Sequence, residues 1–109
     1  MTALSLAAQF VRAHESCRLA AYPDSGGVWT VGWGHTGAEV HEGLSWTQAE
    51  ADAQLDADLA EFAEAVTRLK RRLLSDQQMA ALISFAFNLG VDALANSTLL
   101  TLVNDCPLS

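Results

Sequence analysis

Between Glu15 and Thr36 the chain reads ESCRLAAYPDSGGVWTVGWGHT, and this stretch decides the fold that we expect. Glu15 ends an amphipathic segment, Asp24 lies in a Pro-Asp-Ser-Gly-Gly turn, and Thr30 follows in a short apolar strand. Hydrolysis of a glycosidic bond requires one acid that protonates the leaving oxygen and one ionised carboxylate that activates water or stabilises the sugar cation. A turn that brings two carboxylates and a hydroxyl together supplies these groups, so the three residues are candidates for catalysis.

The segments on either side of the turn differ in their hydrophobic pattern. Apolar residues recur at helical spacing over residues 5–15, which predicts a helix with one buried face. Over residues 18–43, glycines separate short β-rich pieces, of which 28–33 is the clearest strand. We therefore expect a helix followed by a small antiparallel sheet. The apolar face of the helix consists of Leu6, Ala7, Phe10, Val11 and His14.

A long connecting helix is predicted over residues 46–69. Ser45 and Thr47 are both potential N-caps, with Gln48 and Glu50 respectively three residues later, a spacing typical of a capping box. The apolar stripe of this helix consists of Leu55, Leu59, Phe62, Val66 and Leu69. The acids expected on its solvent side are Asp52, Asp56, Asp58, Glu61 and Glu64.

The rest of the chain is predicted to be a helical region over residues 75–104. Ser75 and Gln78 have the spacing of a second capping box, and the almost wholly apolar helix that they begin ends at Gly90. A short helical turn near 91–95 and a last apolar helix capped by Ser97 follow. The residues of the apolar helix that we expect to point inward are Met79, Leu82, Ile83, Ala86 and Leu89.

This order of segments predicts a single α+β domain over residues 1–109, with a β-lobe and a mainly helical lobe. The net charge of −7 and the absence of a basic face disfavour nucleic-acid binding. The pattern of the N-terminus is not that of a signal peptide, and no run of residues is apolar enough to enter a membrane. Cys17 and Cys106 are 89 residues apart, so we expect idle thiols, no metal site and no cofactor.

The sequence from residue 18 to residue 36 resembles the active-site segment of the phage-type lysozymes, the endolysins of glycoside hydrolase family 24. The resemblance rests on Arg18-Leu19, Tyr22, Gly26-Gly27, Thr30 and the run Gly32-x-Gly34-His35-Thr36. It extends to Ser84-Phe85-x-Phe87-Asn88-x-Gly90 and to Asn96-Ser97-Thr98-Leu99-Leu100, so that nearly the whole chain is covered. The resemblance implies a lysozyme fold, in which a β-lobe and a helical lobe face each other across a sugar-binding cleft.

The resemblance also implies an activity and a role for each candidate residue. It implies a muramidase that cleaves the β-1,4 bond between N-acetylmuramic acid and N-acetylglucosamine in peptidoglycan. Glu15 would be a partly buried general acid, Asp24 the base, and Thr30 the residue that holds the attacking water, with inversion at the anomeric carbon and carboxyl groups roughly 6.5–9.5 Å apart. From the residues alone, Glu15 is equally a surface or ion-paired acid, Asp24 a turn-capping residue and Thr30 a common strand residue.

Further residues would bind the sugar or support the site. The family match assigns the sugar-facing positions to Thr36, Phe87, Asn88 and Ser97, although core packing and helix capping explain Phe87 and Ser97 as well. His35 has no second ligand at metal spacing, and we expect it to be a hydrogen-bonding residue at the cleft floor. The positions expected to support the site are Arg18, Tyr22, Gly32, Gly34 and His35.

Two features depart from the family pattern. Ser16 stands where the family has glycine, which costs about 1 kcal/mol if the helix ends there in a left-handed turn. Family members also continue through further helices and a basic tail, whereas this sequence ends at Ser109, so we expect a C-terminally truncated member with an incomplete helical lobe.

The expected partners follow from the family and from this truncation. An active chain would act on peptidoglycan and would stay in the cytoplasm of the bacterial host until a holin opens the membrane. An uncovered helical face predicts self-association. The alternatives are a truncated, inactive lysozyme-like protein and an interaction module that needs a partner to cover this face.

Overall fold

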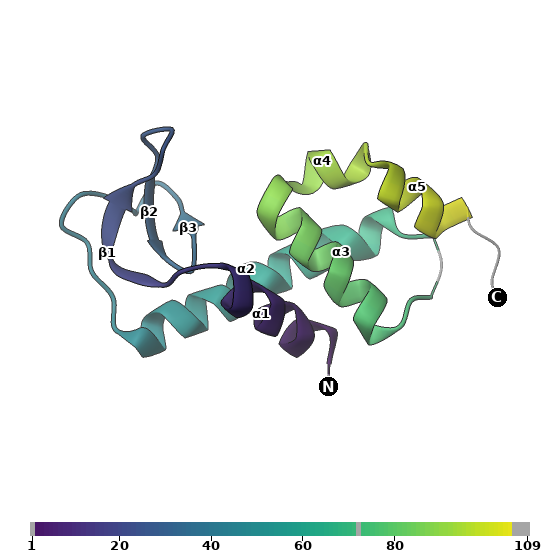
Figure 1. Cartoon of the computed structure of the whole chain (residues 1–109), viewed down its shortest axis with the longest axis horizontal. Coiled ribbons are helices and arrows are strands. Elements are labelled where there is room, and N and C mark those ends of the chain that lie inside the picture. The colour runs from purple at the N-terminus through teal and green to yellow at the C-terminus, as the bar shows by residue number, and fades with distance from the viewer. Residues whose placement is uncertain (1, 72, 106–109) are drawn as a thin grey trace. The chain divides into compact units, whose positions relative to one another are not determined.

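The computed structural model describes residues 2–71 and 73–105 (Figure 1). The chain divides into two compact units. We call residues 8–58 the sheet unit, and residues 1–7 together with 59–109 the helical unit. Two helices, α1 (Ala3–His14) and α2 (Gln48–Leu69), each contribute residues to both units.

The sheet unit contains a three-stranded antiparallel sheet with the order β1-β2-β3 (Figure 1). Thr30 on the central strand pairs with Tyr22 on one side and with Thr36 on the other. These three residues therefore form one row across the sheet, because directly opposed residues of an antiparallel pair project to the same face. The strands are β1 (Arg18–Pro23), β2 (Trp29–Gly32) and β3 (His35–Thr36).

Gly32, at the end of β2, is buried and has a φ of +67°. A Cβ atom at this position would lie 3.1 Å from the Trp46 ring. A side chain at this position would therefore fit only if the Trp46 ring moved away slightly. Gly43 also has a positive φ, +92°, but a Cβ there would meet nothing within 4 Å.

Helix α1 begins two residues before the predicted start and ends at His14, one residue before the predicted end. Ala7 and Val11 are buried, as the helical spacing predicts. Phe10 is 42% exposed and His14 is exposed, so their assignment to the buried face is wrong. Ser16 follows with no positive φ, so the left-handed conformation that penalises serine does not occur there.

Helix α2 begins with the predicted capping box. The Thr47 hydroxyl accepts the Glu50 backbone N–H at 3.1 Å, and the Glu50 carboxylate accepts the Thr47 N–H at 2.9 Å. The apolar stripe is buried at Leu55, Leu59 and Val66 and half-buried at Phe62 and Leu69. Two acids expected on the solvent side, Asp52 and Asp58, are instead half-buried.

The helical unit continues with α3 (Asp76–Leu89), α4 (Val91–Ala95) and α5 (Thr98–Asp105). The predicted capping box of Ser75 and Gln78 is confirmed, and α3 ends at Gly90, whose φ is +96°. Leu82, Ile83 and Ala86 are buried. Leu89 is 63% exposed, so the expectation that it points inward is wrong, because it occupies the last turn of the helix.

Over residues 2–71 and 73–105, none of the helices combines the length and the hydropathy needed to cross a bilayer. The same residues contain no group of three or more histidine, cysteine or acidic side chains that could hold a metal ion. Cys17 is a free thiol, while Cys106 lies outside the described residues.

Replacement of Gly32 by alanine should destabilise the fold more than the same change at Gly43. Both substitutions place a side chain at positive φ, which costs about 1 kcal/mol. Gly32→Ala also forces the Cβ against the Trp46 ring, which adds about 1–3 kcal/mol of overpacking. Urea unfolding of the two variants measures the difference. Equal losses in the two variants would show that the approach to Trp46 imposes no constraint.

Candidate active site

Asp24 organises the turn between β1 and β2. Its Oδ1 atom accepts the backbone N–H groups of Gly26 at 2.8 Å and Val28 at 2.9 Å. Two backbone hydrogen bonds close the same turn, from Asp24 N–H to the Val28 carbonyl and from Gly27 N–H to the Asp24 carbonyl, both 2.9 Å. The turn-capping role that the residue type suggests is therefore present. The second carboxylate oxygen, Oδ2, has no hydrogen-bond partner among the described residues.

Thr30 lies in the middle of the row that it forms with Tyr22 and Thr36. Its side chain is 5% exposed, and its hydroxyl donates to the Val28 carbonyl at 3.0 Å. Because this bond uses the only hydroxyl proton, Thr30 can take part in further hydrogen bonds only as an acceptor. Thr36, the neighbour on β3, is exposed.

Glu15 directly follows α1, and its backbone N–H donates to the Val11 carbonyl at 2.8 Å. Its side chain is exposed, so the expected partial burial is wrong. The helix ends one residue earlier, and Glu15 begins the connection to β1. No described residue pairs with its carboxylate, because the two nearby arginines, Arg12 and Arg18, have other partners.

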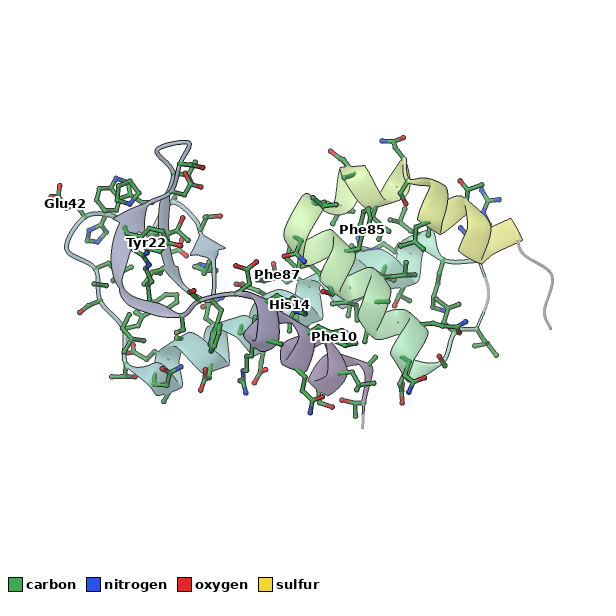
Figure 2. All side chains as sticks on the ribbon, in the orientation of Figure 1. Phe10, His14, Tyr22, Glu42, Phe85 and Phe87 are labelled. Atoms are coloured by element: carbon green, nitrogen blue, oxygen red, sulfur yellow. The ribbon has the colours of Figure 1, made fainter. Side chains whose placement is uncertain are left out.

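Arg18 places its guanidinium 4.5 Å from the ring centroid of Tyr22, a cation–π contact within β1. Tyr22 is labelled in Figure 2. Arg18 pairs with Gly32 and Tyr22 with Thr30, with an irregular register between them. The contact therefore spans the irregular part of β1. Gly34, another supporting position expected from the sequence, lies in the turn between β2 and β3.

His35 binds two carboxylates at once. Its Nδ1 lies 2.8 Å from Asp58 Oδ2 on α2, and its Nε2 lies 2.6 Å from Glu39 Oε1. Carboxylate oxygens only accept, so both ring nitrogens must donate, which requires the protonated imidazolium. Burial opposes that charge, but the hydrogen bonds that His35 donates to Glu39 and Asp58, together with the negative charges of these two groups, outweigh burial and raise the pKa of His35 above its ordinary value of 6.5. The same hydrogen bond, which Glu39 accepts from His35, lowers the pKa of Glu39 below its ordinary value of 4.5.

A second polar cluster surrounds Asp52 at the start of α2. Trp33 Nε1 donates to Asp52 Oδ1 at 2.8 Å, Gln48 Nε2 donates to the same oxygen at 3.0 Å, and Arg12 lies 3.8 Å away. The hydrogen bonds from Trp33 and then Gln48 lower the pKa of Asp52 below its ordinary 3.8. Gln48 also contacts the Cys17 sulfur at 3.6 Å.

The sequence reasoning missed Glu39, Asp52 and Asp58 as partners of site residues. A signal for the last two was present, since each lies three positions from Leu55 and therefore at the border of the apolar stripe of α2. A polar side chain at such a border is half-buried and needs a partner. Nothing in the sequence marked Glu39, which reaches His35 from an irregular loop.

Three expected sugar-binding residues belong to the helical unit, whereas Glu15, Asp24, Thr30 and Thr36 belong to the sheet unit. Phe87, which is labelled in Figure 2, is half-buried. Its ring packs edge-on against Phe62, with ring centroids 5.8 Å apart. Asn88 is exposed. The Ser97 hydroxyl donates to the Leu94 carbonyl at 2.7 Å and accepts the Leu100 N–H at 3.0 Å, so it caps α5.

Comparison with known families identifies the chain. The family described as phage lysozyme matches residues 12–108. The chain belongs to the phage lysozyme family. The SAR-endolysin of Escherichia phage Mu is 45% identical over 83 residues, covering 76% of this chain and 48% of that protein. The endolysin of Salmonella phage P22 is 38% identical over 98 residues, covering 86% of this chain and 67% of that protein.

Solved structures agree with this assignment. The muramidase domain of SpmX from Asticaccaulis excentricus has a TM-score of 0.82 and 36% sequence identity, covering 94% of this chain and 67% of that chain. The α+β lysozyme-like fold expected from the sequence is therefore confirmed. This member of the phage lysozyme family spans about a third to two thirds of the length of the first curated relatives that it matches.

The stability of this family member should depend on pH through His35 and Glu39. His35 has a raised pKa, so its contribution is complete below pH 6.5 and is lost as the pH rises through that raised pKa. Glu39 has a lowered pKa, so its contribution is complete above pH 4.5 and is lost as the pH falls through that lowered pKa. We expect His35→Gln to lower the free energy of unfolding most between these two values, as measured by urea unfolding at several pH values.

An NMR titration of the imidazole separates this effect from general destabilisation. Glu39→Gln should lower the pKa of His35, because it removes one of the two acceptors that favour the imidazolium. Glu42→Gln is the matched control, since it removes a charge from the same loop and Glu42 has no contact with the ring. An unchanged His35 pKa in Glu39→Gln would contradict the interaction.

Proposed function

We propose that this chain carries the catalytic site of a muramidase, which hydrolyses the β-1,4 bond between N-acetylmuramic acid and N-acetylglucosamine. Membership of the phage lysozyme family supports an activity on peptidoglycan. The observation that carries the finer proposal is the Asp24 turn. It fixes one carboxylate oxygen by two backbone hydrogen bonds and leaves the other without a partner among the described residues.

In this proposal, Asp24 and Thr30 hold the attacking water together. Asp24 Oδ2, which has no hydrogen-bond partner among the described residues, is the oxygen that would accept a proton from this water. The hydroxyl proton of Thr30 is committed to Val28, so Thr30 can offer the water only a lone pair. A water that donates one hydrogen to each residue keeps its own lone pair for the anomeric carbon, and displacement by that water inverts the configuration.

Glu15 is the proposed general acid, which protonates the oxygen of the leaving sugar. Its side chain is exposed and without a partner among the described residues, so no internal bond must break before it meets the substrate. The exposure of Glu15 in the free chain is therefore compatible with the role.

The proposed sugar-binding residues differ in how free their side chains are. Thr36 and Asn88 are exposed and can present a hydroxyl and an amide to a glycan. Ser97 already uses its proton and accepts one backbone bond, so its direct contribution to binding would be small. Phe87 can offer only the part of its ring that Phe62 leaves uncovered. We therefore assign glycan contact first to Thr36 and Asn88.

Glu15→Gln should abolish most of the release of muropeptides from purified Gram-negative peptidoglycan. The amide keeps the shape of the side chain but cannot donate the proton, and general acid catalysis contributes about 10²–10⁴-fold to a rate. Glu61→Gln is the matched control, because it makes the same change at an exposed position of α2. Equal rates for native chain and Glu15→Gln would exclude Glu15 as the acid.

Two substitutions at Asp24 separate its structural and catalytic roles. Asp24→Asn retains an oxygen that can accept from Gly26 and Val28, so the turn should survive while the base is lost and the rate falls. Asp24→Ala loses both acceptors and should also destabilise the chain by about 1–3 kcal/mol. Urea unfolding and muropeptide release measure the two effects. Full activity of a stable Asp24→Asn variant would contradict the role of base.

Access to the wall is part of the proposal. We infer that the chain accumulates in the cytoplasm of the bacterial host and reaches peptidoglycan after a holin opens the membrane. Fractionation of cells that express the chain, with and without a co-expressed holin, tests this course. Wall degradation without membrane opening would contradict it.

A second candidate function is an inactive lysozyme-like chain that associates with a second copy of itself. The observation that favours it is the exposure of Leu73, Leu89 and Leu99, at 91%, 63% and 40%. Sedimentation at several concentrations distinguishes the two candidates. A folded, inactive chain whose mass rises with concentration supports the second, and an active monomer excludes it.

A further inference from the structure

A small pocket lies in the helical unit where the end of α2 meets α4 and α5. Its volume is about 220 Å³. Figure 1 shows the end of α2 and the helix α5 on the same side of this unit, and two hydrogen bonds join them. None of the residues assigned to the proposed muramidase site lines this pocket. Its lining consists of Leu69, Arg71, Ala95, Leu100, Thr101 and Asn104.

Asn104 fixes the backbone of the pocket. Its Oδ1 accepts the Arg71 N–H at 2.8 Å, and its Nδ2 donates to the Leu69 carbonyl at 3.2 Å. The Asn104 amide therefore binds one backbone N–H and one backbone carbonyl at the C-terminal end of α2. These bonds hold the Arg71 backbone against α5, so the Cα atom from which the Arg71 side chain extends is fixed beside the pocket.

The sequence segment that contributes Arg71 to this pocket is rich in basic residues. Four of the six basic residues, namely Arg68, Lys70, Arg71 and Arg72, fall within five positions, although the net charge of the chain is −7. Arg68 has a distant, exposed ion pair with Glu64 at 4.0 Å. The guanidinium of Arg71 has no ion pair among the described residues. Such a local positive field attracts anions even to an acidic protein.

We propose that this pocket binds a phosphate group, with Arg71 as the principal ligand. A guanidinium presents two parallel N–H donors that match two oxygens of a phosphate. Thr101 can add a donor, since its hydroxyl makes only a long 3.3 Å bond to the Ser97 carbonyl and can turn toward the ligand. Leu69, Ala95 and Leu100 make part of the lining apolar, and a charge pair beside apolar groups is less screened by water.

Phosphate suits this pocket better than a carboxylate. A phosphate monoester carries about −1.5 to −2 charges at neutral pH and three strong acceptor oxygens, whereas a carboxylate carries one charge and two oxygens. The attraction between the basic residues of segment 68–72 and the anion is therefore stronger for a phosphate than for a carboxylate. The group can be free in solution or part of a lipid headgroup, and the experiment below separates these two sources.

The first measurement is a titration of the native chain with inorganic phosphate, followed through backbone amide shifts in NMR spectra. We expect saturable shifts at Arg71, Thr101 and Asn104, with a dissociation constant on the order of 1–10 mM. Arg71→Gln should weaken binding about tenfold or more. Arg68→Gln is the matched control, because it removes the same charge three residues away but does not line this pocket.

The outcomes decide the proposal without reference to lytic activity. Equal weakening by Arg71→Gln and Arg68→Gln would mean that a diffuse field attracts the anion, and the proposed pocket would be refuted. No saturable shifts in the native chain would refute it as well. Thermal unfolding of both variants checks that each is folded, and Thr101→Val provides a second test that leaves every charge in place.

Vesicles then identify the source of the phosphate. Co-sedimentation is measured with phosphatidylcholine vesicles that contain or lack phosphatidylglycerol, using the native chain and both arginine variants. Binding to the anionic vesicles that depends on Arg71 but not on Arg68 assigns a lipid headgroup. Phosphate binding without vesicle binding assigns a soluble phosphate compound. Both outcomes support the pocket, whereas a native chain that binds neither probe overturns it.

Discussion

The two hydrogen bonds that Asp24 Oδ1 accepts from Gly26 and Val28 are the constraint on which the proposed site depends. They close the turn between β1 and β2, and the turn sets the register of the two strands. That register places Thr30 opposite Tyr22, and β3 continues the row to Thr36. A shift of one residue would turn Thr30 to the other face of the sheet, so the turn that Asp24 helps to close determines which hydroxyl the site contains.

A second set of polar contacts attaches the first half of α2 to Trp33 and His35, at the end of the sheet. His35 binds Asp58, and Trp33 binds Asp52, so two side chains from the end of the sheet reach two acids of one helix. The Asp58 side chain is only 16% exposed, where an unpaired charge is costly, whereas Asp52 is 37% exposed. These contacts all lie within the sheet unit, to which Glu15, Asp24 and Thr30 also belong.

Much of the fold could be predicted from local signals. The capping boxes at Thr47 and Ser75 and the glycine at the end of α3 mark helix ends by hydrogen bonds within a few residues, and all three are present. The errors at His14 and Leu89 have another origin. Helical spacing shows which residues share a face, but it does not show how far along the helix that face is covered. Burial at a helix end depends on what packs against it.

The sequence by itself determined the family, the order of the elements and the candidate residues Glu15, Asp24 and Thr30, because short motifs and hydrophobic periods act over a few positions. Only the tertiary structure decided the state of each side chain. In that structure Glu15 is exposed, the Thr30 hydroxyl donates its proton to the Val28 carbonyl, and His35 pairs with Glu39 and Asp58. The tertiary structure also assembled Leu69, Arg71 and Asn104 into a pocket from segments more than thirty residues apart. Contacts between such distant segments depend on how the elements pack, and no local pattern in the sequence encodes them.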